Sequence, residues 1–141
     1  MSAPGELAAW RDAAAPSLDD IAALAAAAFA ALPRKFRRLA GEVIFRVDDF
    51  PSDEVLEDLG LEDPFELTGL YQGVDLARRS VLDASPTPAR VFLYRRPILD
   101  EWAERGDVGL ADLVAHVLTH EIGHHLGLSD DDIDAIEAAA E

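Results

Sequence analysis

Two histidines four residues apart, with a glutamate directly after the first, form the part of the chain best suited to chemistry. They lie in the segment His120-Glu121-Ile122-Gly123-His124. Residues four apart on an α-helix lie one turn above each other on the same face, so both imidazoles can converge on one metal ion. Glu121 would then stand beside them, at the height of a water molecule on that ion. This is the H-E-x-x-H pattern of helical zinc sites, and it predicts Zn²⁺ as the cofactor.

The position of Glu121 around this helix gives a second indication that does not depend on the motif. When the helix is projected at about 100° per residue, apolar side chains such as Leu113, Val117 and Ile122 form one broad arc, and Glu121 falls inside it. A glutamate is rarely buried without a partner, so this position is costly unless it faces a polar cleft or a cation. The pattern favours an active site. The alternative is a helix whose histidines only satisfy hydrogen bonds in the core.

A zinc site that keeps an open position for water needs a third protein ligand. Gly127 follows the helix and can take the left-handed conformation that ends it and turns the chain back. Asp130 comes three residues later and is within reach of the ion after that turn, so we expect it to be the third ligand. Asp131 or a water molecule could take its place. Ser129 and the aspartates after it are also good N-caps for a final helix.

The two remaining histidines have other expected roles. His116 lies one turn before His120, which places it at the boundary of the site rather than among the ligands. His125 points about 100° away from His124 around the helix, so it cannot comfortably bind the same ion. We expect it to be a core histidine with a hydrogen-bonded ring.

The apolar periodicity and the positions of caps, glycines and prolines predict the elements that must hold these residues. Ser17 followed by Asp20 resembles a capping box at the start of the first long helix. Helices are expected at 17–32, 33–41, 97–105, 108–126 and from 131 onward; strands at 43–47, 67–71 and 91–94; a loop with one short helix at 48–66; and a turn at 85–88. This order predicts an α+β fold with a small mixed sheet and a long zinc-binding helix. We expect one domain, 1–141, in which 1–16 is loosely ordered.

The composition limits the classes of partner. The 141 residues carry 12 Lys and Arg against 28 Asp and Glu, a formal net charge of −16. Such an acidic protein is repelled by nucleic acids and by anionic membrane surfaces, so we expect neither as a partner. The chain has no cysteine, which excludes disulfides, thiolate zinc sites and cysteine nucleophiles. Any metal must therefore be held by histidine and carboxylate side chains.

The longest apolar stretch, Ile21–Leu32, is too short to cross a bilayer. It does not resemble a signal peptide either, because Asp19 and Asp20 precede it where a basic segment would be expected. We therefore expect a protein of the cytoplasm.

Three segments together resemble a known group, the minimal bacterial zincins regarded as possible neutral zinc metallopeptidases. The segments are Leu67–Gly73, Val91–Pro97 and Val117–Asp130, and the resemblance covers roughly residues 40–132. The last segment reads H-E-x-x-H-x-x-G-x-x-D, which is similar to the metzincin signature with aspartate in place of the usual third histidine. The resemblance implies a compact zincin-like fold with the zinc helix packed under a small sheet.

Carried onto this chain, the resemblance implies that His120 and His124 are the helix ligands, Glu121 the general base and Asp130 the third ligand. The methionine turn of metzincins is absent, because Met1 is the only methionine.

The leading functional hypothesis is a zinc-dependent metallopeptidase that hydrolyses peptide or protein substrates. A zinc-bound water would attack the scissile bond and Glu121 would act as general base. We expect an extended substrate to pair with an exposed strand, Val91–Tyr94. The alternatives are a catalytically weak zincin-fold module that binds a protein partner, with a structural metal or none, and a metal-dependent hydrolase of another substrate.

Overall fold

The computed structural model of the chain describes residues 11–41, 43–73 and 89–140. Its first long helix, α2 (Leu18–Ala31), is followed by the short helix α3 (Arg34–Ala40). Asp20 and Ser17 exchange backbone-to-side-chain hydrogen bonds of 2.8 and 3.1 Å, which confirms the predicted capping box. The expectations for residues 1–10 and for the turn at 85–88 lie outside the described residues.

The three strands in the described part of the chain form one mixed sheet, as predicted. They are β1 (Ile44–Asp48), β2 (Gly69–Gln72) and β3 (Arg90–Tyr94), and their order in the sheet is β1-β3-β2. β1 runs parallel to β3 and β2 runs antiparallel to it. The prediction that Val91–Tyr94 is an open edge is therefore wrong. Alternating apolar residues identify a strand, but they do not say how many neighbours it has, and β3 is paired on both sides.

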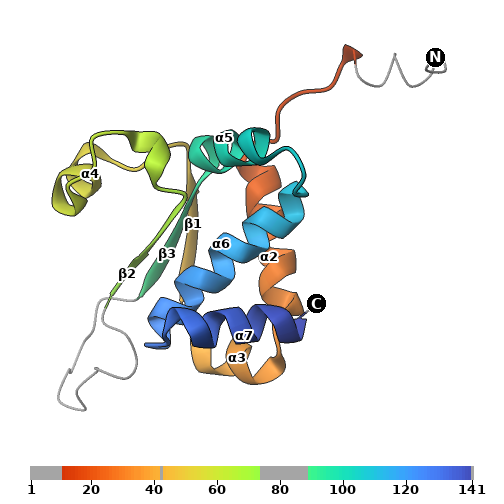
Figure 1. Cartoon of the computed structure of the whole chain (residues 1–141), viewed down its shortest axis with the longest axis vertical. Helices are drawn as coiled ribbons and strands as arrows, with labels where there is room; N and C mark the ends of the chain where they lie inside the picture. Colours follow the sequence, from red (N-terminus) through yellow and green to blue (C-terminus); the bar gives the residue numbers. More distant parts are fainter. Residues whose placement is uncertain (1–10, 42, 74–88, 141) are drawn as a thin grey trace.

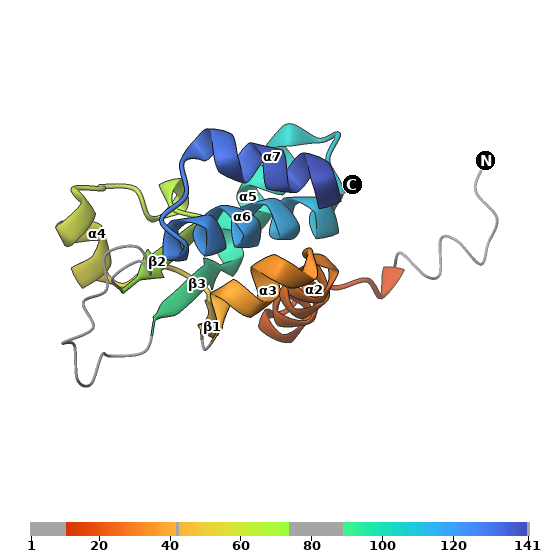
Figure 2. The same cartoon turned by 90° about the horizontal axis from the view of Figure 1, so that it is seen from below.

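The segment between β1 and β2 contains one short α-helix, α4 (Asp53–Leu59), and a single 3₁₀ turn, η1 (Pro64–Glu66). The side chain of Ser52 caps α4, and Gly60 ends it in the left-handed conformation. This agrees with the prediction of a loop that carries one short helix. In both views of the molecule α4 lies away from α2 (Figures 1 and 2).

Three helices complete the chain: α5 (Arg95–Arg105), α6 (Leu110–His125) and α7 (Asp130–Ala140). α5 begins directly after β3, two residues before the predicted start at Pro97. Proline is tolerated in the first turn of a helix, where its missing N–H has no helical acceptor, so Pro97 does not mark the first residue. In the described part of the chain, no helix is both long enough and apolar enough to span a bilayer.

The core forms on the sheet face that carries Val91 and Leu93, both fully buried. α2 and α6 cover this face, and α7 packs on the other side of α6, so that α6 lies between α7 and α2 (Figure 2). The cluster also contains Ile21 and Ala25 of α2. These observations confirm the predicted α+β class and a long, largely buried helix at its centre. That helix is the element that carries the histidines.

Candidate metal centre

Three side chains that can bind a metal meet near the C-terminal end of α6. One ring nitrogen each of His120 and His124 and one carboxylate oxygen of Asp130 lie within 4.8 Å of one another. Nε2 of His120 is 3.6 Å from Oδ1 of Asp130, and the two imidazole centroids are 4.9 Å apart. The helical spacing thus brings the two rings together, and the chain after the helix adds the carboxylate.

The geometry of this cluster fits a zinc ion. Bonds of about 2.0–2.2 Å in a tetrahedral site separate neighbouring ligand atoms by about 3.4 Å. The 3.6 Å between His120 and Asp130 is close to that separation. His124 and Asp130 are exposed, so their side chains can rotate toward an ion without disturbing the core. Two imidazoles and one carboxylate leave a fourth position open, as catalytic zinc sites require.

The turn after α6 gives Asp130 its position. Gly127 has a φ of 73°, in the left-handed region, as its place after the helix predicts. Its N–H donates to the carbonyl of His124 at 3.0 Å, and the N–H of Leu128 donates to the carbonyl of Gly123 at 2.9 Å. These two hydrogen bonds form a Schellman motif, which ends the helix and reverses the chain. α7 therefore begins beside the last turns of α6.

Ser129, rather than Asp130, caps α7. The N–H of Asp132 donates to Oγ of Ser129 at 3.2 Å, and the N–H of Ser129 donates to the carboxylate of Asp132 at 3.4 Å. This pair makes a capping box, so the helix start does not need the side chain of Asp130. Asp131, the alternative third ligand, does not belong to the cluster found among the described residues.

A close contact between α6 and α7 holds this arrangement. Gly123 lies on the face of α6 that α7 covers, and a Cβ at this position would overlap the side chain of Ile133. Ile133 is completely buried. The glycine inside the histidine motif is therefore required by the packing of the next helix, three residues after Asp130.

Glu121 is half-buried on the side of α6 that faces β2. Burial raises the pKa of its carboxyl group, while the charge of His120 and a hydrogen bond from the backbone N–H of Tyr71 lower it by less. A cavity of about 130 Å³ opens beside it, and Thr68 and His116 also line this cavity. Glu121 thus borders a small polar cleft and does not lie on a freely solvated convex surface.

The two other histidines lie apart from the three donors. Nδ1 of His116 is 2.9 Å from the carboxylate of Glu137, and its ring centroid is 6.2 Å from that of His120. His125 is buried, with Nε2 3.0 Å from the carbonyl oxygen of Ala40 and Nδ1 3.0 Å from the hydroxyl of Tyr71. A carbonyl only accepts, so Nε2 carries the hydrogen. The prediction of a core histidine with a hydrogen-bonded ring is confirmed.

Two tyrosines that no sequence motif indicates lie close to Glu121. Tyr71 contacts α6 twice, through its N–H to Glu121 and through its hydroxyl to His125. Burial raises the pKa of Tyr94 to about 12, and the negative charges of Asp48 and Glu121 add to the shift. No local pattern marks either tyrosine, because both contacts join β-strands to a helix some 30 to 50 residues later in the chain.

Comparison with known proteins agrees with this geometry. No curated protein matches the sequence. A sequence model of the zincin-like metallopeptidases matches residues 40–140, which include the whole sheet, α6 and α7. The match covers most of the chain and contains every residue of the candidate metal centre. The chain therefore belongs to the zincin-like metallopeptidase family.

Proposed function

We propose that the protein is a zinc-dependent peptidase in which His120, His124 and Asp130 hold one Zn²⁺ and Glu121 is the general base. One observation carries the proposal: the three donors converge at the end of α6 while a half-buried carboxylate stands beside them at a cavity. Family membership supports the same class of activity.

The chemistry of the site follows from its donor set. A bound Zn²⁺ supplies Lewis-acid chemistry, because it polarises a peptide carbonyl and lowers the pKa of a water molecule. Glu121 accepts a proton from the attacking water and donates it to the leaving amine. Burial raises the pKa of Glu121 toward the working pH, which suits a group that must both take and return a proton. The N–H of Tyr71 orients its carboxylate.

In this proposal an extended substrate pairs with β2 and not with β3. β2 is an edge strand of the described sheet and lies next to Glu121. Its first residue, Gly69, allows β2 to lie this close to α6. A Cβ at this position would come within 2.7 Å of Val117 and 3.3 Å of Cγ of Glu121. A peptide added along β2 would pass the catalytic carboxylate.

Two substitutions with opposite signatures test the proposal. Glu121→Gln keeps the size of the side chain and removes the base, so zinc should stay bound while hydrolysis falls about 10²–10⁴-fold. Asp130→Ala should leave two neutral imidazoles, which hold zinc poorly, so the protein should be metal-poor. Zinc content by elemental analysis and cleavage of a random peptide library are the two measurements.

Each outcome has a clear meaning. Full activity in Glu121→Gln would refute the role of Glu121. Unchanged zinc content in Asp130→Ala would refute the third ligand. A fully metallated protein that cleaves nothing in the library would favour the protein-binding module instead.

A further inference from the structure

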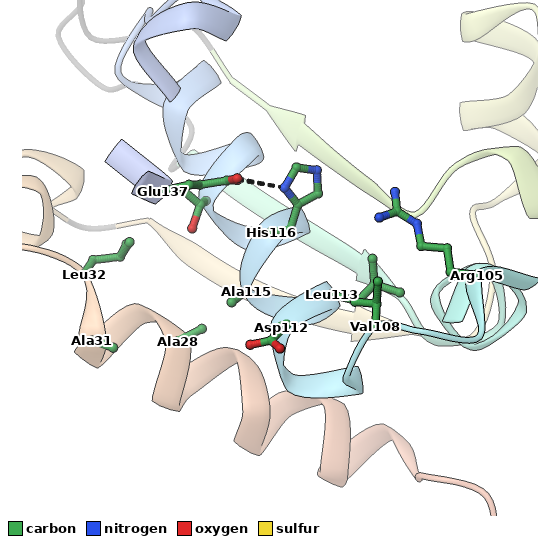
Figure 3. Close-up of a pocket in the computed structure, with 11 residues that line it drawn as sticks. Ala28, Ala31, Leu32, Arg105, Val108, Asp112, Leu113, Ala115, His116 and Glu137 are labelled. Atoms are coloured by element: carbon green, nitrogen blue, oxygen red, sulfur yellow. Dashed lines mark hydrogen bonds and ion pairs between the residues drawn. The ribbon is translucent and has the colours of Figure 1, made fainter. Parts of the chain in front are cut away.

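A histidine–glutamate pair, in which the side chain of His116 is 48% exposed, joins α6 and α7 two turns away from the candidate ligand Asp130. Nδ1 of His116 lies 2.9 Å from Oε1 and 3.0 Å from Oε2 of Glu137 (Figure 3). The side chain of Glu137 is only 25% exposed. Among the described residues, its buried Oε1 has no well-aligned hydrogen bond, so the imidazole is the partner that compensates it.

The pair lies at the edge of a large cavity. A cavity of about 680 Å³ lies between α2 and α6, and His116 and Glu137 line it together with Leu32 and Thr119 (Figure 3). Glu137 is the residue of α7 among those that line this cavity. Because Oε1 of Glu137 is buried while His116 is half-exposed, we expect a contribution at the upper end of the 0–1 kcal/mol or so that exposed pairs give.

The position of α7 decides whether Asp130 reaches the site. Asp130 and Glu137 are seven residues apart, about 10.5 Å along the helix axis, and Ile133 contacts Gly123 between them. If α7 pivots at Ile133 by about 10°, Asp130 moves by roughly 0.8 Å, since it lies about 4.5 Å from the pivot. Metal–ligand distances tolerate deviations of only about 0.2 Å. The exposed side chain of Asp130 can rotate to follow part of such a shift, so a small swing of α7 weakens the third ligand without removing it.

We infer that Glu137 and His116 are positioning residues for the metal centre. Their ion pair fixes the far end of α7 on α6, Ile133 acts as the pivot, and Asp130 is held 3.6 Å from His120 as a result. Neither residue binds the ion in this scheme. The inference rests on the proposed zinc site, and it adds a role for a histidine that the motif itself does not use.

The test is the zinc affinity of the full chain, measured at fixed pH by competition with a chromogenic chelator. Glu137→Ala and His116→Ala should each weaken zinc binding about 10-fold, at the lower end of what supporting residues around metal sites contribute. The double variant should bind zinc about as tightly as the weaker-binding of the two single variants, because both changes break the same pair. Glu137→Gln should recover most of the affinity, because its amide oxygen still accepts from Nδ1. Asp134→Ala, an exposed acid on the same helix, is the matched control and should bind zinc normally.

Amide hydrogen exchange in the metal-free protein gives a second readout. The amides of α7 should exchange faster in Glu137→Ala and His116→Ala than in Asp134→Ala. Equal zinc affinity in Glu137→Ala and Asp134→Ala overturns the inference, and so does a loss of affinity without faster exchange in α7. If the unmodified chain binds no zinc, the proposed function fails, while the exchange comparison still decides whether the pair docks α7.

Discussion

The substitution Gly123→Ala should damage both the fold and the metal centre. In an open helix, replacing glycine by alanine gains about 1 kcal/mol. Here the added methyl group would overlap Cγ1 and Cδ1 of Ile133, which is fully buried and cannot turn away into solvent. Since the new Cβ would lie 2.3 Å from Cγ1 of Ile133, restoring an ordinary carbon–carbon contact of about 3.7 Å requires α7 to move by about 1.4 Å.

The steric clash and the gain in helix propensity have opposite effects on stability. Overpacking a filled core costs about 1–3 kcal/mol, so after the gain in helix propensity we expect a net loss of about 1 kcal/mol in the free energy of unfolding. A shift of α7 by about 1.4 Å also exceeds the tolerance of about 0.2 Å for metal ligands, so zinc affinity should fall at least about 10-fold.

Urea unfolding of the metal-free protein measures the loss in the free energy of unfolding, and chelator competition measures the loss of zinc affinity. Ile133→Ala provides the control background, because it removes the two clashing atoms and leaves the Cβ of residue 133 at an ordinary distance of 3.6 Å. In that background Gly123→Ala should stabilise the protein by about 1 kcal/mol, a coupling of about 2 kcal/mol between the two sites. A Gly123→Ala single variant that is more stable than the unmodified chain and binds zinc equally well would refute this packing argument.

Three further predictions concern the side chains around the site. Because burial raises the folded-state pKa of Glu121 above its ordinary 4.5, ionising the carboxylate begins to cost stability as the pH rises above about 4.5, and the cost is complete above the folded-state pKa. In the metal-free protein, Glu121→Gln should therefore raise the melting temperature at pH 7, and this advantage should disappear below about pH 4.5, as scanning calorimetry would show. Tyr71→Phe leaves Nδ1 of the buried His125 without its hydroxyl partner, and urea unfolding should register a loss of about 1–3 kcal/mol. Ser129→Ala removes the cap of α7 and should cost about 1 kcal/mol together with some zinc affinity; an unchanged free energy of unfolding would contradict the capping role.

Much of the fold could be predicted because its signals are local. The capping box at Ser17, the left-handed turn at Gly127 and the apolar arc of α6 each depend on residues within a few positions of one another. The spacing of His120 and His124 is local in the same sense, which is why the motif indicated that their rings would meet. Helical geometry alone fixes that distance.

The features that were not predicted depend on contacts between distant segments. β3 became the central strand because both β1 and β2 pair with it, and no property of Val91–Tyr94 by itself distinguishes that position from an edge. The pairing of His116 with Glu137 joins residues 21 positions apart, and it depends on the crossing of two helices. Periodicity shows which face of α6 is buried, but it does not show which later residue covers that face.

The most direct test of the metal assignment is an anomalous difference map, recorded at the zinc absorption edge from a crystal of the zinc-loaded protein. We expect one peak, about 2.0–2.2 Å from a ring nitrogen each of His120 and His124 and from a carboxylate oxygen of Asp130. A peak at another place, for instance between His116 and Glu137, or a peak at the two histidines with Asp130 turned away, would contradict the assignment.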